Sequence, residues 1–130
     1  LPAELRVGQG YGKVSWAVRT FWEEYVGWFK LRSTTELYPD SADAALAELL
    51  DAAGVDAALA KAESALESGD APLAIRIGEA MAATSPEDPR LRALMAGAHR
   101  YLLDNGGDQS FWEHGWLVTE LARWEGQAND

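Results

Sequence analysis

The sequence predicts an all-α fold, and three observations support this prediction. Alanine, leucine and glutamate dominate the middle of the chain, a composition that favours helices. β-Branched residues are sparse, and no segment alternates apolar and polar residues over the length of a strand. Glycine and proline separate segments of helical apolar periodicity, where they end one helix and start the next. We therefore expect a bundle of about six helices in a single domain over residues 1–130.

Turn and capping residues define the ends of the expected helices. Asp40 and Ser41 can cap a helix N-terminus, and Gly54 can end that helix in the left-handed conformation. Asp108 or Ser110 can cap the last helix. After an irregular N-terminal segment over 1–12, the expected helices run from about 13 to 31, from the Asp40–Ser41 cap to 53, from 57 to 67, from 71 to a stop before Pro86, from 89 to 103 and from 111 to 124, with a frayed tail over 126–130.

The middle of the chain carries one weak repeat signature. Gly69-Asp70, Ala74-Ile75 and Pro86 have the spacing of a tetratricopeptide-like helix hairpin. The glycine permits a tight turn, the alanine permits close helix approach, and the proline ends the second helix. Because stacked repeats need about three units for stability, an ordinary antiparallel hairpin inside a bundle is an equally good interpretation.

Large apolar side chains occur on two sides of the first expected helix. At about 100° per residue, one broad face is apolar, and Trp16 lies on the opposite side beside Thr20 and Gly27, with Trp28 at the edge. A small domain rarely exposes tryptophan, because the ring has a large apolar area. We therefore expect partners on two sides of this helix, one of them outside this chain. The broad face consists of Val14, Val18, Phe21, Trp22, Tyr25 and Phe29.

The last expected helix is apolar over most of its circumference. Leu117, Leu121 and Trp124 share one side, and Phe111 and Val118 share nearly the opposite side. A helix of this kind is normally buried, and two such helices exceed what the core of one small domain needs. Another polypeptide surface must then cover the surplus. We expect a dimer or domain interface formed by Trp16, Thr20, Gly27, Trp28, Leu117, Leu121 and Trp124.

Net charge and cysteine content exclude several classes of partner. The formal net charge of −10 argues against nucleic acids, whose phosphates require a basic surface, and against anionic membranes. Solubility alone explains such a charge. The absence of cysteine excludes disulfides and thiolate metal sites, and no apolar segment approaches the roughly 20 residues of a membrane span. The compartment, cytoplasm or periplasm, stays open.

The sequence contains no motif that places catalytic side chains at a recognised spacing. His99 and His114 lie on different expected helices, and neither has a histidine or an acidic residue at metal-ligand spacing. Glu23 and Glu24 are adjacent and therefore point apart on a helix; Glu23 is better placed to pair with Arg19. We expect no catalytic and no metal-binding residue here. The residues describe a helical interaction module.

Several motifs resemble one known family. Tyr11-Gly12-x-Val14, Val18-Arg19 and Tyr25-x-Gly27-Trp28-Phe29 are similar to the opening of the alkyl sulfatase dimerisation domain. The segments Glu36-Leu37-Tyr38-Pro39 and Ala52-Ala53-Gly54-Val55-Asp56 resemble its next two junctions, and Gly69-Asp70, Ala74 and Pro86 resemble its hairpin. The similarity covers about residues 9–124.

The resemblance implies a role for the chain inside a longer enzyme. In that family a helical domain follows a metallo-β-lactamase-type catalytic domain that carries two zinc ions. Together they hydrolyse alkyl sulfate esters such as dodecyl sulfate, and a lipid-carrier-like domain often follows. Members form dimers in which helical arms wrap around each other. The chain is then a homodimerisation domain excised from a longer hydrolase, with no activity and no cofactor of its own.

One departure from the family pattern concerns the substrate. Family members commonly carry a His-Asn pair where this chain has Trp16-Ala17, which puts a sulfate ester substrate in question. Tyr11, at the junction between domains, is a candidate contributor to the catalytic pocket or a packing residue. Two alternatives to the dimerisation domain stay open: a tetratricopeptide-like adaptor that binds a peptide, and a helical carrier whose tryptophans line an apolar cavity.

Overall fold

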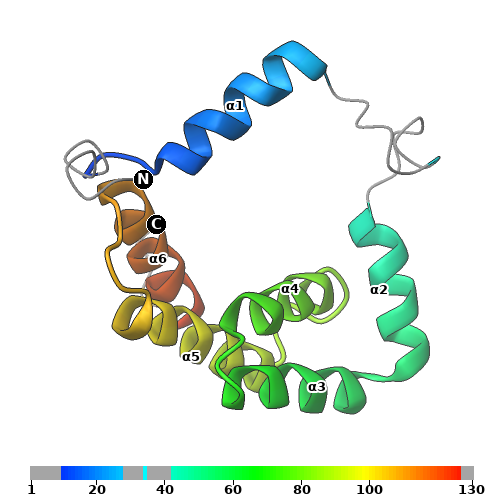
Figure 1. The fold of residues 1–130 in the computed structure, drawn as a ribbon. Helices are drawn as coiled ribbons and strands as arrows, with labels where there is room; N and C mark the ends of the chain where they lie inside the picture. Colours follow the sequence, from blue (N-terminus) through cyan, green and yellow to red (C-terminus); the bar gives the residue numbers. More distant parts are fainter. Residues whose placement is uncertain (1–9, 28–33, 35–41, 127–130) are drawn as a thin grey trace. The chain divides into compact units, whose positions relative to one another are not determined.

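The computed structural model describes residues 10–27, 34 and 42–126, and over these residues it contains six α-helices and no β-strand (Figure 1). The predicted all-α class is confirmed. The helices are α1 (Val14–Val26), α2 (Ala42–Ala53), α3 (Val55–Glu67), α4 (Ala71–Ala82), α5 (Pro89–Asn105) and α6 (Phe111–Trp124).

The chain divides into two compact units. One comprises Leu1–Asp40 and Asp108–His114, and therefore contains α1 and the first turn of α6. The other comprises Ser41–Gly107 and Gly115–Asp130, with α2 to α5 and the remainder of α6. Among the described residues, the buried apolar core belongs to this second unit.

Helix α1 ends at Val26, earlier than the predicted end at about Leu31. Gly27 adopts a φ of 74°, in the left-handed region that glycine tolerates best, and its N–H donates to the Glu23 carbonyl at 2.9 Å. The prediction overestimated the helix because the apolar periodicity runs past this glycine in the sequence. Residues 28–33 lie outside the described residues.

Small side chains let the helices of the second unit approach closely. α4 packs against both α3 and α5, and α2 also packs against α3 and α4. Ala71, Ala74 and Ala98 are fully buried in one cluster, where a larger side chain would force the helices apart. The main cluster consists of Ala58, Leu59, Ala62, Met81, Leu91, Leu94 and Met95.

A tight turn joins α3 to α4. Gly69 has a φ of 85° in this turn, and the Asp70 side chain accepts a hydrogen bond from the Leu73 N–H at 3.1 Å at the start of α4. Helix α4 ends at Ala82, before Pro86 as predicted. The turn therefore forms where the sequence places it, and its tetratricopeptide-like character stays a prediction.

An arginine fixes the start of α5. The Asp88 carboxylate accepts a hydrogen bond from the Arg90 N–H at 2.8 Å, and the Arg90 guanidinium lies 3.0 Å from Asp88 and 2.6 Å from Asp56 of α3. Hydrogen bonds from the Arg90 side chain and backbone hold the pKa of Asp88 below its usual value. This exposed bridge links the N-terminal ends of α3 and α5.

We expect Gly78→Ala to destabilise the second unit, although alanine normally stabilises a helix by about 0.5–1 kcal/mol over glycine. A Cβ atom at Gly78 would overlap Met95 Sδ and would lie 3.4 Å from Leu91 Cδ1, and both of these side chains are enclosed. The free energy of unfolding, measured by urea denaturation, should fall by about 1–3 kcal/mol.

Gly115→Ala in α6 is the matched control, because no atom of the described part of the chain lies within 4 Å of the added Cβ. For this variant the free energy of unfolding should rise by about 0.5–1 kcal/mol. If Gly78→Ala stabilised the chain as much as Gly115→Ala, the close α4–α5 contact described above would be incorrect.

Candidate interaction surface

One face of α1, here called the α1 face, is apolar and exposed. It consists of Val14, Val18, Phe21, Trp22 and Tyr25, which recur at helical spacing and are between 39% and 87% exposed. A helix normally buries such a stripe against its own domain. Contiguous exposed apolar surface of this kind is typical of interaction sites.

The opposite side of α1 carries a second group of predicted interface residues. Trp16 is 39% exposed, and the Thr20 hydroxyl donates to the Trp16 carbonyl at 3.1 Å. Lys13 Nζ lies 5.8 Å from the centre of the Trp16 ring, within range of a cation–π interaction. Gly27 is half-buried at the C-terminus of α1, and Trp28 lies outside the described residues.

Three aromatic side chains form a cluster at the start of the first unit, here called the N-terminal aromatic cluster. The Tyr11 ring stacks on Phe111 at 6.0 Å between ring centres and 8° between planes, and it meets Trp112 edge-on at 5.9 Å. The Phe111 N–H donates to the Gly10 carbonyl at 2.7 Å. These contacts connect the segment before α1 to the first turn of α6, and all three rings remain more than half exposed.

An ion pair supports this cluster. Lys13 Nζ lies 2.7 Å from Oε1 and 2.6 Å from Oε2 of Glu113, and both side chains are less than one-third exposed. Ser110 is buried, and its Oγ accepts a hydrogen bond from the Glu113 N–H at 3.3 Å, so Ser110 caps α6. Sequence reasoning singled out Tyr11 but missed these partners. Lys13 and Glu113 are 100 positions apart, and no local pattern connects them.

The second unit covers some of the predicted interface residues itself. Leu117 is 8% exposed, and Trp124 packs against the main core cluster. Leu121 is half-buried. An intermolecular role for these three residues stays a prediction, since part of their cover comes from their own unit. Trp116 and Val118 are the large apolar residues of this part of α6 that are exposed.

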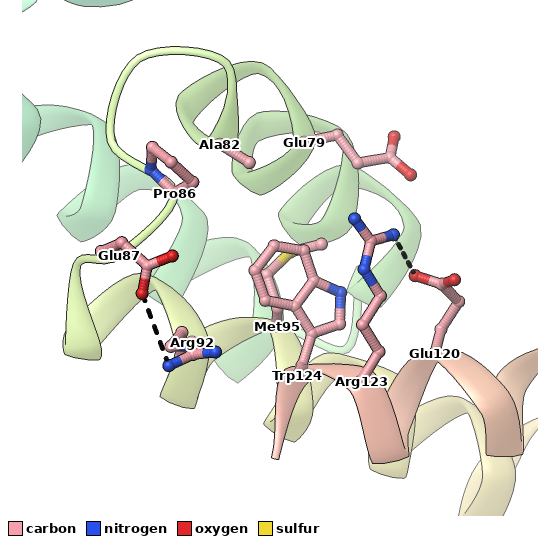
Figure 2. A pocket seen from close by; sticks show the side chains of 9 residues that line it. All are labelled: Glu79, Ala82, Pro86, Glu87, Arg92, Met95, Glu120, Arg123 and Trp124. Atoms are coloured by element: carbon pink, nitrogen blue, oxygen red, sulfur yellow. Dashed lines mark hydrogen bonds and ion pairs between the residues drawn. The ribbon is translucent and has the colours of Figure 1, made fainter. Parts of the chain in front are cut away.

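A cavity of about 350 Å³ lies beside Trp124 in the second unit (Figure 2). The Trp124 Nε1 atom is buried and has no hydrogen-bond partner among the described residues. Arg123 lies 3.5 Å from Glu120, and Arg92 lies 3.7 Å from Glu87 across the cavity wall (Figure 2). Because each arginine already faces a carboxylate, these two arginines offer little uncompensated positive charge to an incoming anion. Trp124 is the tryptophan in this wall, so the cavity differs from the tryptophan-lined site of a carrier.

The two histidines make local hydrogen-bond contacts. His99 is buried, with Nδ1 2.7 Å from the Met95 carbonyl oxygen, and His114 Nδ1 lies 3.1 Å from Gln109 Oε1. Over residues 10–27, 34 and 42–126, no group of three or more His, Cys, Asp or Glu side chains is placed to hold a metal ion. Within the same ranges, no helix combines the length and the apolar character that crossing a membrane requires.

The chain is similar to a family of helical dimerisation domains over most of its length. The sequence model of the family described as alkyl sulfatase dimerisation matches residues 1–118, which include α1 to α5 and the first half of α6. The α1 face and the N-terminal aromatic cluster both fall inside the matched residues. No curated protein and no solved structure matches the chain.

We expect Lys13→Met to weaken the first unit by removing the partner of a partly shielded carboxylate. The free energy of unfolding should fall by at most about 1 kcal/mol at low salt, and by less at high salt, where ion pairs are screened. Urea unfolding at two ionic strengths measures both values. Lys61→Met, an exposed change in α3 with the same loss of charge, should stay within about 0.5 kcal/mol. Equal losses for the two variants would contradict a stabilising role for the Lys13–Glu113 pair.

Proposed function

The chain belongs to the alkyl sulfatase dimerisation family, and we propose that it is the dimerisation module of an alkyl sulfatase-like hydrolase. In this proposal two copies of the chain associate through the α1 face. The observation that carries the proposal is the exposure of five large apolar side chains on one helix inside the family match.

The composition of the α1 face supports association with another protein. Interface cores are enriched in aromatic residues and depleted in charge, and Phe21, Trp22 and Tyr25 supply one residue of each aromatic type. Each copy carries a formal net charge of −10, so two copies repel each other at long range. A contact surface without charged side chains avoids placing like charges directly opposite each other.

The opposite side of α1 belongs to the same proposal. There Trp16, Thr20, Gly27 and Trp28 contribute to a dimer or domain interface. The exposed Trp16 ring supports this role, because a tryptophan that neighbours leave uncovered is a typical interface anchor.

We assign packing roles to Tyr11 and to two α6 residues, Leu117 and Trp124. The stacking of Tyr11 on Phe111 supports a packing role for Tyr11 over a contribution to a catalytic pocket. The burial of Leu117 and the contacts of Trp124 with the core cluster support a role in the second unit.

We assign the chemistry to a separate domain of the metallo-β-lactamase type with two zinc ions. The family resemblance supports this assignment, and the coding sequence that precedes residue 1 tests it. A His-x-His-x-Asp-His motif in that sequence is the expected result, and its absence would exclude this type of parent. The chain alone should release no sulfate from dodecyl sulfate, whereas the longer protein should hydrolyse an alkyl sulfate or a related ester.

We expect Phe21→Ala to raise the dimer Kd by about 30-fold, or about 2 kcal/mol, because Phe21 lies near the middle of the α1 face. Analytical ultracentrifugation over a range of concentrations measures the Kd, and circular dichroism should show nearly unchanged helicity. A wild-type chain that stays monomeric at high micromolar concentration would overturn the proposed function.

Trp124→Ala separates an interface role from a core role. Since Trp124 packs against the core cluster, its removal should lower the free energy of unfolding by about 2 kcal/mol or more. Its effect on the Kd should be smaller than that of Phe21→Ala. The reverse pattern would place the main interface on α6 in place of α1.

A further inference from the structure

We propose that α1 of one copy packs antiparallel against α1 of a second copy, about a two-fold axis near the middle of the helix. Val14 then lies opposite Tyr25 of the second copy, and Val18 lies opposite its Phe21. This inference rests on the proposed homodimer and specifies how its two central helices meet.

The spacing of the α1 face fits a helix-pair seam. Val14, Val18, Phe21 and Tyr25 are spaced by four, three and four residues, the pattern that places side chains along one line of a coiled-coil contact. All four are exposed among the described residues, which leaves the seam open to a partner in the proposed dimer. A two-fold dimer uses the same patch on both copies, so this seam must be complementary to itself.

The sizes of the seam residues favour the antiparallel direction. The N-terminal half of the seam carries two valines, and the C-terminal half carries Phe21 and Tyr25. An antiparallel pair places each ring opposite a valine, so large and small side chains alternate along the contact and fill it evenly. A parallel pair places ring against ring at one end and valine against valine at the other, which leaves the valine end loosely packed.

The charges beside the seam favour the same direction. Lys13 stands at the N-cap of α1, and Glu24, at about 100° per residue, lies along one edge of the α1 face near the other end of the helix. A two-fold antiparallel pair brings the N-cap of one helix to the C-terminal end of the other, so Lys13 approaches Glu24 of the second copy twice. A parallel pair keeps Lys13 and Glu24 at opposite ends. It places the Glu24 edge against Ser15 and Trp22, which carry no charge. The Lys13 ammonium has three donors and can hold Glu113 and Glu24 of the second copy together.

The helix dipole adds an independent argument. The first turn of α1 has no acidic residue and its last turn has no basic residue. Instead, Lys13 stands at the N-cap, and Glu24 lies near the C-terminal end, where each charge opposes the dipole of its own helix. An antiparallel neighbour brings the opposite dipole end and the opposite charge to each position.

Disulfide cross-linking tests the arrangement, because the chain has no cysteine of its own. Val14→Cys and Tyr25→Cys are made on separate 130-residue chains that differ in mass, then mixed and oxidised. We expect the mixed disulfide to exceed either homodisulfide at least about tenfold, since in an antiparallel pair identical positions stay about 16 Å apart along the helix. Glu63→Cys on α3, mixed with Val14→Cys, is the control and should give no specific product.

The alternative outcomes of this cross-linking experiment distinguish a failure of the antiparallel pair from a failure of the proposed function. Homodisulfides at both positions would show parallel helices, and a sedimenting dimer without any of these cross-links would show that α1 meets another surface. Either result overturns the antiparallel pair and leaves the dimer intact. A monomeric wild-type chain would overturn both proposals.

A charge reversal tests the edge contact. Glu24→Lys should raise the dimer Kd about tenfold, because it places two lysines together at each end of the pair. Glu63→Lys makes the same change in net charge at an exposed site on α3 and should leave the Kd within about twofold. If the two variants raised the Kd equally, the proposed Lys13–Glu24 contact would be excluded.

Discussion

Five large side chains of α1 are exposed among the described residues, and each gains free energy when another surface covers it. The gain is about 25 cal/mol for each Å² of apolar area removed from water. The helix has 13 residues, a length at which an isolated helix is marginally stable in water, so it depends on its neighbours for its own formation. Within the described first unit, those neighbours are the N-terminal aromatic cluster and the Lys13–Glu113 pair. A second copy on the α1 face would therefore both cover this helix and stabilise it.

The second unit does not share this dependence. Its helices approach closely through buried alanines, and Leu91 and Met95 fill the space between them. Trp124 packs on this core, so part of the surplus apolar surface expected on the last helix is used within the chain. The two units thus have different physical roles. The second is a self-contained helical scaffold, and the first presents the apolar surface to which the proposed dimer is assigned.

Local signals predicted most of this fold. Composition, periodicity and capping residues gave the all-α class and the position of α6, because helix ends depend on a few neighbouring residues. The predicted end of α1 was wrong. The apolar periodicity continues past Gly27 in the sequence, but the φ of 74° at Gly27 ends the helix. Periodicity also predicted the apolar character of the α1 face. It did not predict the exposure of that face, because the interface was expected on the opposite side, at Trp16. The partners of Tyr11 could not be predicted, because Phe111 and Trp112 reach it through a tertiary contact that no local pattern encodes.

The seating of Met95 against Gly78 has a consequence for chemical reactivity. The chain has two methionines, Met81 and Met95, and they are 2% and 1% exposed in the core of the second unit. A thioether enclosed in this way is shielded from peroxide until the helices around it separate, and a sulfoxide formed there would not fit back beside Gly78. The rate of methionine oxidation therefore reports how often this scaffold opens. Because both methionines lie in the core of the second unit, their oxidation rate depends on the opening of that unit.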